Sequence, residues 1–184
     1  AILGEVPDPV AGPGELLVEV HATAANFVDI LLIGGKHQSK PKLPYIPGKG
    51  PAGVVLVVGE GVSGFAPGDR VLAMCEPGGG YAELLALPAT MCHRMPDSLT
   101  FTEAAAMALI YDTAWFSLCD RGRLQPGDCV LVMGATGGVG LAAIQLVKAL
   151  GGRALAAVAD SSKAYLATDA GADAVINIGC DDVL

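Results

Sequence analysis

The segment that most constrains the fold is a short apolar run followed at once by closely spaced glycines. Residues 129–133, Cys-Val-Leu-Val-Met, carry no charge, which is typical of a parallel strand covered on both faces. Residues 134–140 then read Gly-Ala-Thr-Gly-Gly-Val-Gly, so Ala135, Gly137 and Gly140 have the spacing of a GxGxxG motif with alanine in the first place. The pattern predicts a strand, a tight turn and the start of a helix.

Such a turn suits a phosphate ligand. The middle glycine lets a pyrophosphate approach the backbone, and the last glycine lets the helix pack closely against the strand. The first N–H groups of a helix lack intrahelical acceptors and carry partial positive charge, which favours phosphate. The alternative is an ordinary glycine-rich turn of an α/β protein. An apolar helix expected over 138–150 and a second strand over 154–158 favour the dinucleotide-binding interpretation.

The residues after 158 continue the same alternation. A helix is expected over 162–170 and a strand over 174–178, which completes a βαβαβ order, one half of a doubly wound sheet. Before this region, Thr100 is expected to cap a helix that continues through 104–109, and a second helix is expected over 113–121.

The first hundred or so residues have a different character. Pro, Gly and Asp clusters separate short β-prone runs, which is typical of a small β-barrel or β-sandwich. The expected strands lie at 15–22, 52–58, 70–74 and 81–87.

Composition excludes several classes of protein. The chain is 52% hydrophobic and 16% charged, which argues against disorder, and no apolar run reaches the length of a membrane span. A net charge of −8 argues against a general nucleic-acid surface. The five cysteines are scattered, odd in number and without metal-ligand spacing. They fit a reducing, intracellular compartment, either cytoplasmic or mitochondrial.

The chain resembles the zinc-independent quinone oxidoreductases of the medium-chain dehydrogenase/reductase superfamily, and within them the quinone oxidoreductase-like protein 2 group. The matching segments occur in the order that the family has. They are residues 6–9, 12–15, 24–29, 43–48, 52–55, 58–62, 68–71, 79–83 and 124–148.

The resemblance implies an α/β protein with an N-terminal GroES-like β-domain over residues 1–121 and a truncated Rossmann (βαβαβ) domain over 122–184. It places the active site in the cleft between the two domains. Relatives have roughly twice this length, so the chain is expected to be a fragment that lacks the first β-strand and the second Rossmann half. Full-length relatives are expected to be homo-oligomers.

The resemblance also implies catalysis without zinc. Zinc-dependent members of the superfamily have Cys, His and Glu where this chain has Asn26, Lys49 and Gly50, which cannot form that site. Hydrogen bonds must then polarise the substrate carbonyl, and the resemblance places Asn26 and Tyr45 in the cleft as candidate donors. The alternative for Asn26 is a turn or cap before a short helix.

The candidate cofactor-binding residues follow from the same resemblance. The pyrophosphate is expected at Ala135, Thr136, Gly137, Gly138, Val139 and Gly140. Tyr111 and Thr113 match a helix start near the nicotinamide, although Thr113 could equally be a helix cap. Ser162 and Lys163 suit the 2′-phosphate of NADP(H), whereas Asp160 lies close to the distance at which an acidic residue selects NAD.

The expected function is NADPH-dependent reduction of quinones or α,β-unsaturated carbonyls by hydride transfer. An NAD(H)-linked relative is a second possibility. A third is a non-catalytic fragment, or a binding or assembly module with residual cofactor affinity. The truncated chain is expected to be a poor catalyst that associates through an unpaired edge of the strand at 129–133.

Overall fold

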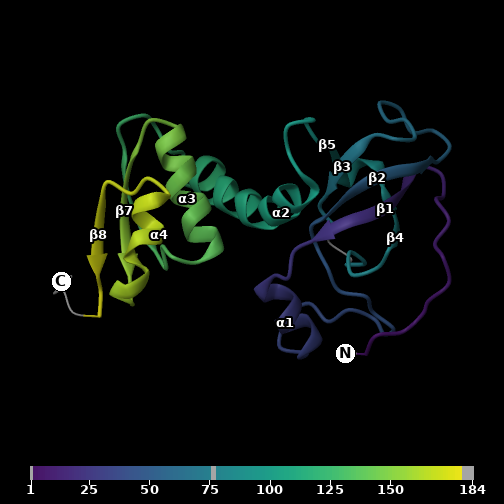
Figure 1. The fold of residues 1–184 in the computed structure, drawn as a ribbon, viewed down its shortest axis with the longest axis horizontal. Coiled ribbons are helices and arrows are strands. Elements are labelled where there is room, and N and C mark those ends of the chain that lie inside the picture. The colour runs from purple at the N-terminus through teal and green to yellow at the C-terminus, as the bar shows by residue number, and fades with distance from the viewer. Residues whose placement is uncertain (1, 76–77, 180–184) are drawn as a thin grey trace. The chain divides into compact units, whose positions relative to one another are not determined.

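The computed structural model describes residues 2–75 and 78–179. The chain divides into two compact units, Ala1–Leu109 and Ile110–Leu184, and Figure 1 shows the helices and strands of each. These units are defined by packing. The domain boundary expected after residue 121 comes from the family resemblance and stays a prediction.

The first unit contains a five-stranded antiparallel sheet in the order β4-β1-β2-β3-β5. The strands are β1 (Glu15–Thr23), β2 (Pro51–Val58), β3 (Arg70–Ala73), β4 (Leu84–Pro88) and β5 (Cys92–Arg94). A short helix, α1 (Phe27–Ile33), follows β1, and a single 3₁₀ turn (Ala89–Met91) joins β4 to β5.

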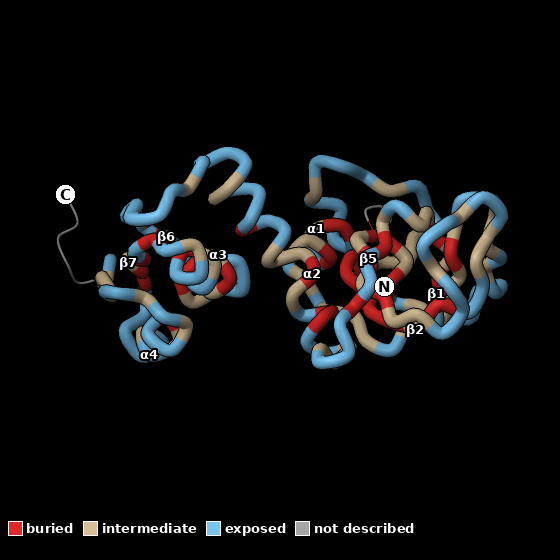
Figure 2. The backbone as a smooth tube through the Cα atoms, turned by 90° about the horizontal axis from the view of Figure 1, so that it is seen from above, coloured by how far each residue is buried: buried red, intermediate tan, exposed pale blue. Residues whose placement is uncertain are grey.

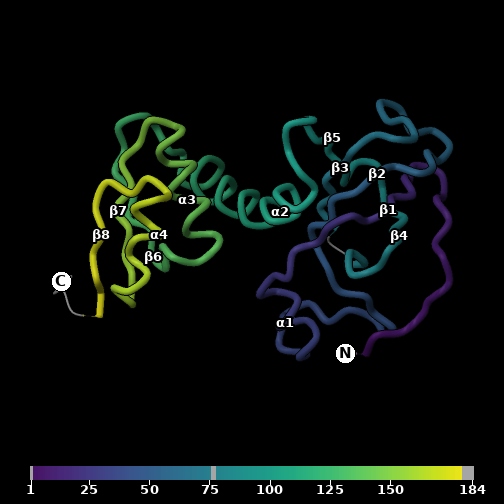
Figure 3. The backbone as a smooth tube through the Cα atoms, viewed as in Figure 1, coloured from purple at the N-terminus to yellow at the C-terminus, as the bar shows by residue number. Residues whose placement is uncertain are grey.

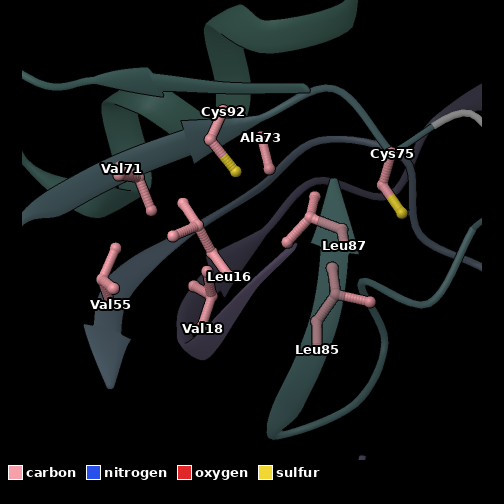
Figure 4. Close-up of a cluster of buried hydrophobic side chains, with 9 residues drawn as sticks. All are labelled: Leu16, Val18, Val55, Val71, Ala73, Cys75, Leu85, Leu87 and Cys92. Carbon is pink, nitrogen blue, oxygen red and sulfur yellow. The ribbon is translucent and has the colours of Figure 1, made fainter. Parts of the chain in front are cut away.

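One face of this sheet forms the core of the first unit. Side chains alternate between the two faces of a strand, so Leu16 and Val18 of β1 are both buried while Leu17 between them is only half-buried. Figure 4 shows them packed with Val55, Val71 and other buried side chains from the neighbouring strands. Full burial of one such side chain stabilises the fold by about 1.5–3 kcal/mol.

The predicted strands of the first unit are confirmed at 15–22, 52–58 and 70–74, each to within about a residue. The expected strand at 81–87 begins later, at Leu84, because residues 78–81 form a glycine-rich loop that bonds to residues 46–48. The strand β5 was missed, since it has three residues and two of them are exposed. The five described strands form one antiparallel half-barrel sheet, so the expected small barrel is confirmed in part, and these strands do not form the two sheets of a sandwich.

The second unit has a three-stranded parallel sheet in the order β6-β7-β8. Its elements are β6 (Cys129–Met133), α3 (Gly138–Ala149), β7 (Arg153–Val158), a 3₁₀ turn (Ser161–Lys163), α4 (Ala164–Asp169) and β8 (Ala174–Asn177). This is the βαβαβ order that the sequence predicts. Ile144 and Val147 of α3 pack against Ala154 and Ala156 of β7, and the buried backbone is red in Figure 2.

The two helices expected before this sheet are in fact one. Helix α2 (Phe101–Trp115) runs directly into a π-helical segment, Phe116–Arg121, as Figure 3 traces. Neither Gly nor Pro interrupts residues 101–121, so no residue forces a break. The predicted cap at Thr100 is confirmed, because Glu103 N–H donates to Thr100 Oγ1 at 3.2 Å and Glu103 Oε2 accepts from Thr100 N–H at 2.9 Å. The alternative reading of Thr113 as a cap is wrong, since it lies inside α2.

The expectation that residues 129–133 are covered on both faces is wrong for the described residues. Val132 is buried, but Leu131 and Met133 are 50% and 62% exposed, and Cys129, expected as a small interior residue, is also exposed. Among the described strands, β6 pairs with β7 alone. The apolar run at 129–133 therefore forms a strand that is covered on one face and paired along one edge.

Candidate functional site: a phosphate-binding turn and a separate carbonyl-binding region

The turn between β6 and α3 has the close approach that its glycines predict. A Cβ atom on Gly140 would lie 2.8 Å from Ala135 Cα and closer still to the Gly134 carbonyl oxygen. Gly134 has a φ of +63°, a conformation that glycine adopts without strain. Ala135 is buried, and its N–H donates to the Ala157 carbonyl of β7 at 3.2 Å. These contacts hold the turn against the sheet.

The start of α3 presents an open, exposed backbone. Gly137 is the N-cap residue, and the exposed Gly138 and Val139 follow it in the first turn of the 12-residue helix. A Cβ on Gly137 would meet nothing closer than the Gly134 carbonyl at 3.4 Å. The first N–H groups of the helix have no intrahelical acceptor. An anion could thus contact the backbone here without obstruction from side chains.

Tyr111 and Thr113 both lie in the part of α2 that belongs to the second unit. The Tyr111 hydroxyl donates to Gln145 Oε1 of α3, which ties the two helices together. The Thr113 carbonyl accepts from Ser117 Oγ at 2.8 Å. Tyr111 is therefore placed near the helix that follows the glycine turn, while the roles of both residues toward a nicotinamide stay predictions.

The residues that follow β7 form a short polar turn. Asp160 Oδ1 accepts from the Ser162 N–H at 2.9 Å and from the Ser162 hydroxyl at 2.7 Å. These hydrogen bonds, with a smaller contribution from Lys163, lower the pKa of Asp160. Asp160 thus caps the 3₁₀ turn and is ionised at neutral pH, with Ser162 and Lys163 beside it and exposed to solvent.

In the first unit, Asn26 is the N-cap residue of α1. Its Nδ2 donates to the Ala24 carbonyl at 3.3 Å, and its N–H donates to Asp29 Oδ2 at 3.0 Å. Asn26 thus turns the backbone before the short helix α1, as the alternative interpretation of this residue predicts. Its role toward a substrate stays a prediction.

Asp29 organises the residues around Asn26. It is 2% exposed and also accepts from the Gly48 N–H at 3.1 Å and from the Tyr81 hydroxyl at 3.1 Å. Burial, followed by the neighbouring Asp29 carboxylate, raises the pKa of Tyr81 to about 12. Sequence reasoning assigned Asp29 no partner at Tyr81, because the two residues are joined only by the tertiary fold.

Tyr45 lies in a different part of the first unit, in the wall of a cavity of about 590 Å³. A Cβ on Gly78 would lie 2.6 Å from the Tyr45 hydroxyl oxygen, so the ring packs directly against the backbone at this glycine. Asn26 is not among the residues that line this cavity. Of the two candidate carbonyl donors, Tyr45 therefore lines this cavity and Asn26 does not.

The positions that would carry zinc ligands hold other contacts. Lys49 is 7% exposed and lines the same cavity as Tyr45. A Cβ on Gly50 would lie 2.6 Å from Ala108 Cβ, so a glutamate side chain has no room there. Within residues 2–75 and 78–179, no group of three or more His, Cys, Asp or Glu side chains is arranged to hold a metal ion.

No helix in the described part of the chain is both long and apolar enough to cross a membrane.

The two units define the class of the protein: an antiparallel β-domain followed by a parallel dinucleotide-binding fold. Residues 12–97 match the alcohol dehydrogenase GroES-like domain. Over most of its length the chain is similar to quinone oxidoreductases of the medium-chain dehydrogenase/reductase superfamily. It is 42% identical over 166 residues to a quinone oxidoreductase-like protein 2 homolog of Nematostella vectensis, covering 90% of this chain and 46% of the relative.

Solved structures agree with this assignment. The crystal structure of Escherichia coli quinone oxidoreductase complexed with NADPH superposes with a TM-score of 0.88 at 33% identity, covering 98% of this chain and 55% of that one. A crystal structure of an NAD-dependent alcohol dehydrogenase gives a TM-score of 0.90 at 35% identity, covering 97% and 60%. The chain thus spans about half the length of the relatives it matches.

Proposed function

We propose that the protein binds NADPH at the β6–α3 turn and acts in the reduction of quinones or α,β-unsaturated carbonyls without zinc. The observation that carries the proposal is the open backbone at Gly137–Val139, held by the close approach of Gly140 to Gly134 and Ala135. The space beside Gly137, where a Cβ would meet nothing closer than 3.4 Å, leaves room for a dinucleotide pyrophosphate. The resemblance to a quinone oxidoreductase complexed with NADPH supports the same ligand.

The nicotinamide of the bound cofactor would supply the hydride. The protein's own residues would bind and orient the two reactants. Ala135–Gly140 hold the pyrophosphate, and Tyr111 and Thr113 lie toward the nicotinamide. Tyr45 or Asn26 would donate a hydrogen bond to the oxygen that gains negative charge, which would take the place of a metal ion. For Asn26 this requires Nδ2 to exchange its 3.3 Å bond to Ala24 for one to the substrate.

The preference for NADPH rests on Ser162 and Lys163. The ammonium of Lys163 suits a 2′-phosphate, and Asp160 is already engaged by Ser162 through two hydrogen bonds. A second candidate is preference for NADH, favoured by the same Asp160 carboxylate and by the resemblance to an NAD-dependent alcohol dehydrogenase. The two candidates differ in which residue contacts the ribose.

Titration of the protein with NADPH and NADH, followed by cofactor fluorescence, tests this proposal. We expect NADPH to bind more tightly than NADH. Lys163→Ala should weaken NADPH binding by about 1.5–3 kcal/mol and leave NADH binding nearly unchanged. Lys148→Ala is the matched control, because Lys148 is bonded to Asp173 at the far end of α3. Tighter NADH binding that Asp160→Ala reverses would establish the second candidate.

Zinc independence is tested by elemental analysis of protein purified without added metal. We expect no stoichiometric zinc, because Asn26, Lys49 and Gly50 stand at the positions of the expected ligands. One equivalent of zinc that is lost on replacing Cys75, Cys92 or His93 would contradict the proposal.

A further inference from the structure

The cavity that contains Tyr45 is unusually rich in cationic side chains. Lys40, Lys42 and Lys49 line it, together with His37, and none of the described residues that line it is acidic. These three lysines are among only 11 Lys and Arg residues in a chain with 19 acidic residues. An overall acidic protein thus concentrates positive charge at one concave site.

The lysines differ in their surroundings. Lys49 is 7% exposed and makes an interaction within the protein, so it is part of the wall. Lys40 and Lys42 are exposed, and neither forms an ion pair with any residue in the described ranges. Two cations close together in one cavity repel each other, and an anion placed between them relieves that repulsion.

His37 adds a further polar group. Its Nδ1 lies 3.1 Å from the Ser39 backbone nitrogen and 3.2 Å from the Ser39 carbonyl oxygen, so the backbone of Ser39 fixes this side of the ring. The same segment of chain, residues 37–42, thus supplies an imidazole and two cations to the cavity.

The remaining wall is apolar. Leu32, Pro41, Pro44 and Ile46 line the cavity alongside the Tyr45 ring. A volume of about 590 Å³ is within the range of small-molecule sites, in which apolar walls bind the body of a ligand and a few polar groups orient it. The cavity therefore suits a flat apolar molecule with one charged end.

We propose that this cavity selects carbonyl substrates that carry an anionic group, with the anion at Lys40 and Lys42 and the apolar body against Leu32 and Ile46. The inference rests on the proposed function, because Tyr45 in the same cavity is a candidate donor to the reacting carbonyl. It narrows the substrates from quinones and enones in general to those with a carboxylate or a similar anion.

Calorimetric binding of 2-naphthoate and 2-naphthamide tests the inference without turnover, since the two ligands have nearly the same shape and differ in charge. We expect the carboxylate to bind roughly tenfold more tightly than the amide. The double variant Lys40→Gln/Lys42→Gln should remove this preference and leave amide binding unchanged. Lys36→Gln is the matched control, because Lys36 directly precedes this segment, is exposed and does not line the cavity.

Salt provides a second measurement. Raising the ionic strength from about 0.05 M to about 0.5 M should weaken binding of the carboxylate but not binding of the amide, because exposed charges are screened at high salt. Equal affinity for the two ligands, no binding of either, or an equal loss with Lys36→Gln would overturn the inference. Circular dichroism of each variant confirms that it is folded.

Kinetics separate this inference from the proposed function. With NADPH present, reduction of anthraquinone-2-carboxylate is compared with that of anthraquinone-2-carboxamide. Selective binding of 2-naphthoate without turnover of either quinone would contradict the proposed function and leave the anion site supported. Turnover of both quinones with equal kcat/KM, and no naphthoate preference, would overturn the anion site alone.

Discussion

The carboxylate of Asp29 joins three separate segments of the first unit. It accepts hydrogen bonds from the N–H groups of Asn26 and Gly48 and from the Tyr81 hydroxyl. Asp29 is 2% exposed and the Gly48 N–H is buried with it, so water does not readily replace the carboxylate as the acceptor for Gly48. The side chain therefore holds the start of α1 against the loops at residues 48 and 81.

We expect Asp29→Ala to lower the free energy of unfolding by about 2–4 kcal/mol, because it leaves the buried Gly48 N–H without an acceptor and removes the hydrogen bonds from Asn26 and Tyr81. Urea denaturation of the two proteins measures this change. Asp97→Ala is the control, since Asp97 is exposed and accepts from Arg70 through its backbone carbonyl. Its effect should lie within about 0.5 kcal/mol. An Asp29→Ala protein as stable as wild type would show that this carboxylate is dispensable.

The raised pKa of Tyr81 predicts that the stability of the folded protein depends on pH in alkaline solution. Burial and Asp29 raise its pKa in the folded protein from 10.0 to about 12. The folded state therefore holds the phenolic proton more tightly than the unfolded state. The stabilisation is fully present below pH 10, and it is lost as pH rises from about 10 through 12.

The difference in unfolding free energy between wild type and Tyr81→Phe should thus shrink over this pH range. Absorbance at 295 nm gives a direct second measurement, because phenolate absorbs there. Tyr81→Phe should remove a component that titrates near pH 12. Loss of a component that titrates near pH 10 would contradict the expected pKa.

At the scale of elements, the glycines of the β6–α3 turn have separable roles. Gly140 lies where a Cβ would collide with backbone atoms of the turn, whereas Gly137 has open space and a φ of −84° that any residue adopts. Gly140 is therefore required for packing of the turn, whereas Gly137 leaves room for a ligand.

We expect Gly140→Ala to destabilise the second unit by about 1–3 kcal/mol, through overpacking of the turn. Gly137→Ala should change stability by less than about 1 kcal/mol and still weaken NADPH binding, because its methyl group enters the phosphate cradle. Thermal unfolding and cofactor fluorescence, measured on both variants, check the two effects. A Gly137→Ala protein that binds NADPH like wild type would contradict the cradle.

At the scale of the whole molecule, β6 carries an exposed apolar surface at a sheet edge. Leu131 and Met133 are 50% and 62% exposed, and among the described strands β6 has a partner on one side only. Exposed edges with apolar side chains promote association between chains. The 184-residue chain should therefore self-associate when expressed by itself.

Sedimentation velocity measures this association. Leu131→Lys/Met133→Lys should increase the monomer fraction, because charge on an edge strand opposes pairing. Leu56→Lys is the control, since Leu56 is 41% exposed on β2, which has a strand on each side. A monodisperse wild-type monomer would refute the prediction.

Local patterns in the sequence determined most of the elements. The βαβαβ order, the cap at Thr100 and the turn before α3 depend on residues within a few positions of one another, so they can be inferred from spacing alone. The break expected between residues 109 and 113 was wrong. Helix propensity continues through this stretch, and a Thr inside a helix resembles a Thr at its cap when only the sequence is known.

Tertiary structure decided the burial and the long-range contacts. An uncharged run at 129–133 indicated a covered strand, but coverage depends on which elements pack against it, and Leu131 and Met133 are exposed. The hydrogen bond between Asp29 and Tyr81 joins residues 52 positions apart, and the cavity brings Leu32 together with Gly78. Such contacts depend on how the chain folds back on itself, so spacing in the sequence could predict the glycine turn but not the cavity that Leu32 and Gly78 help to enclose.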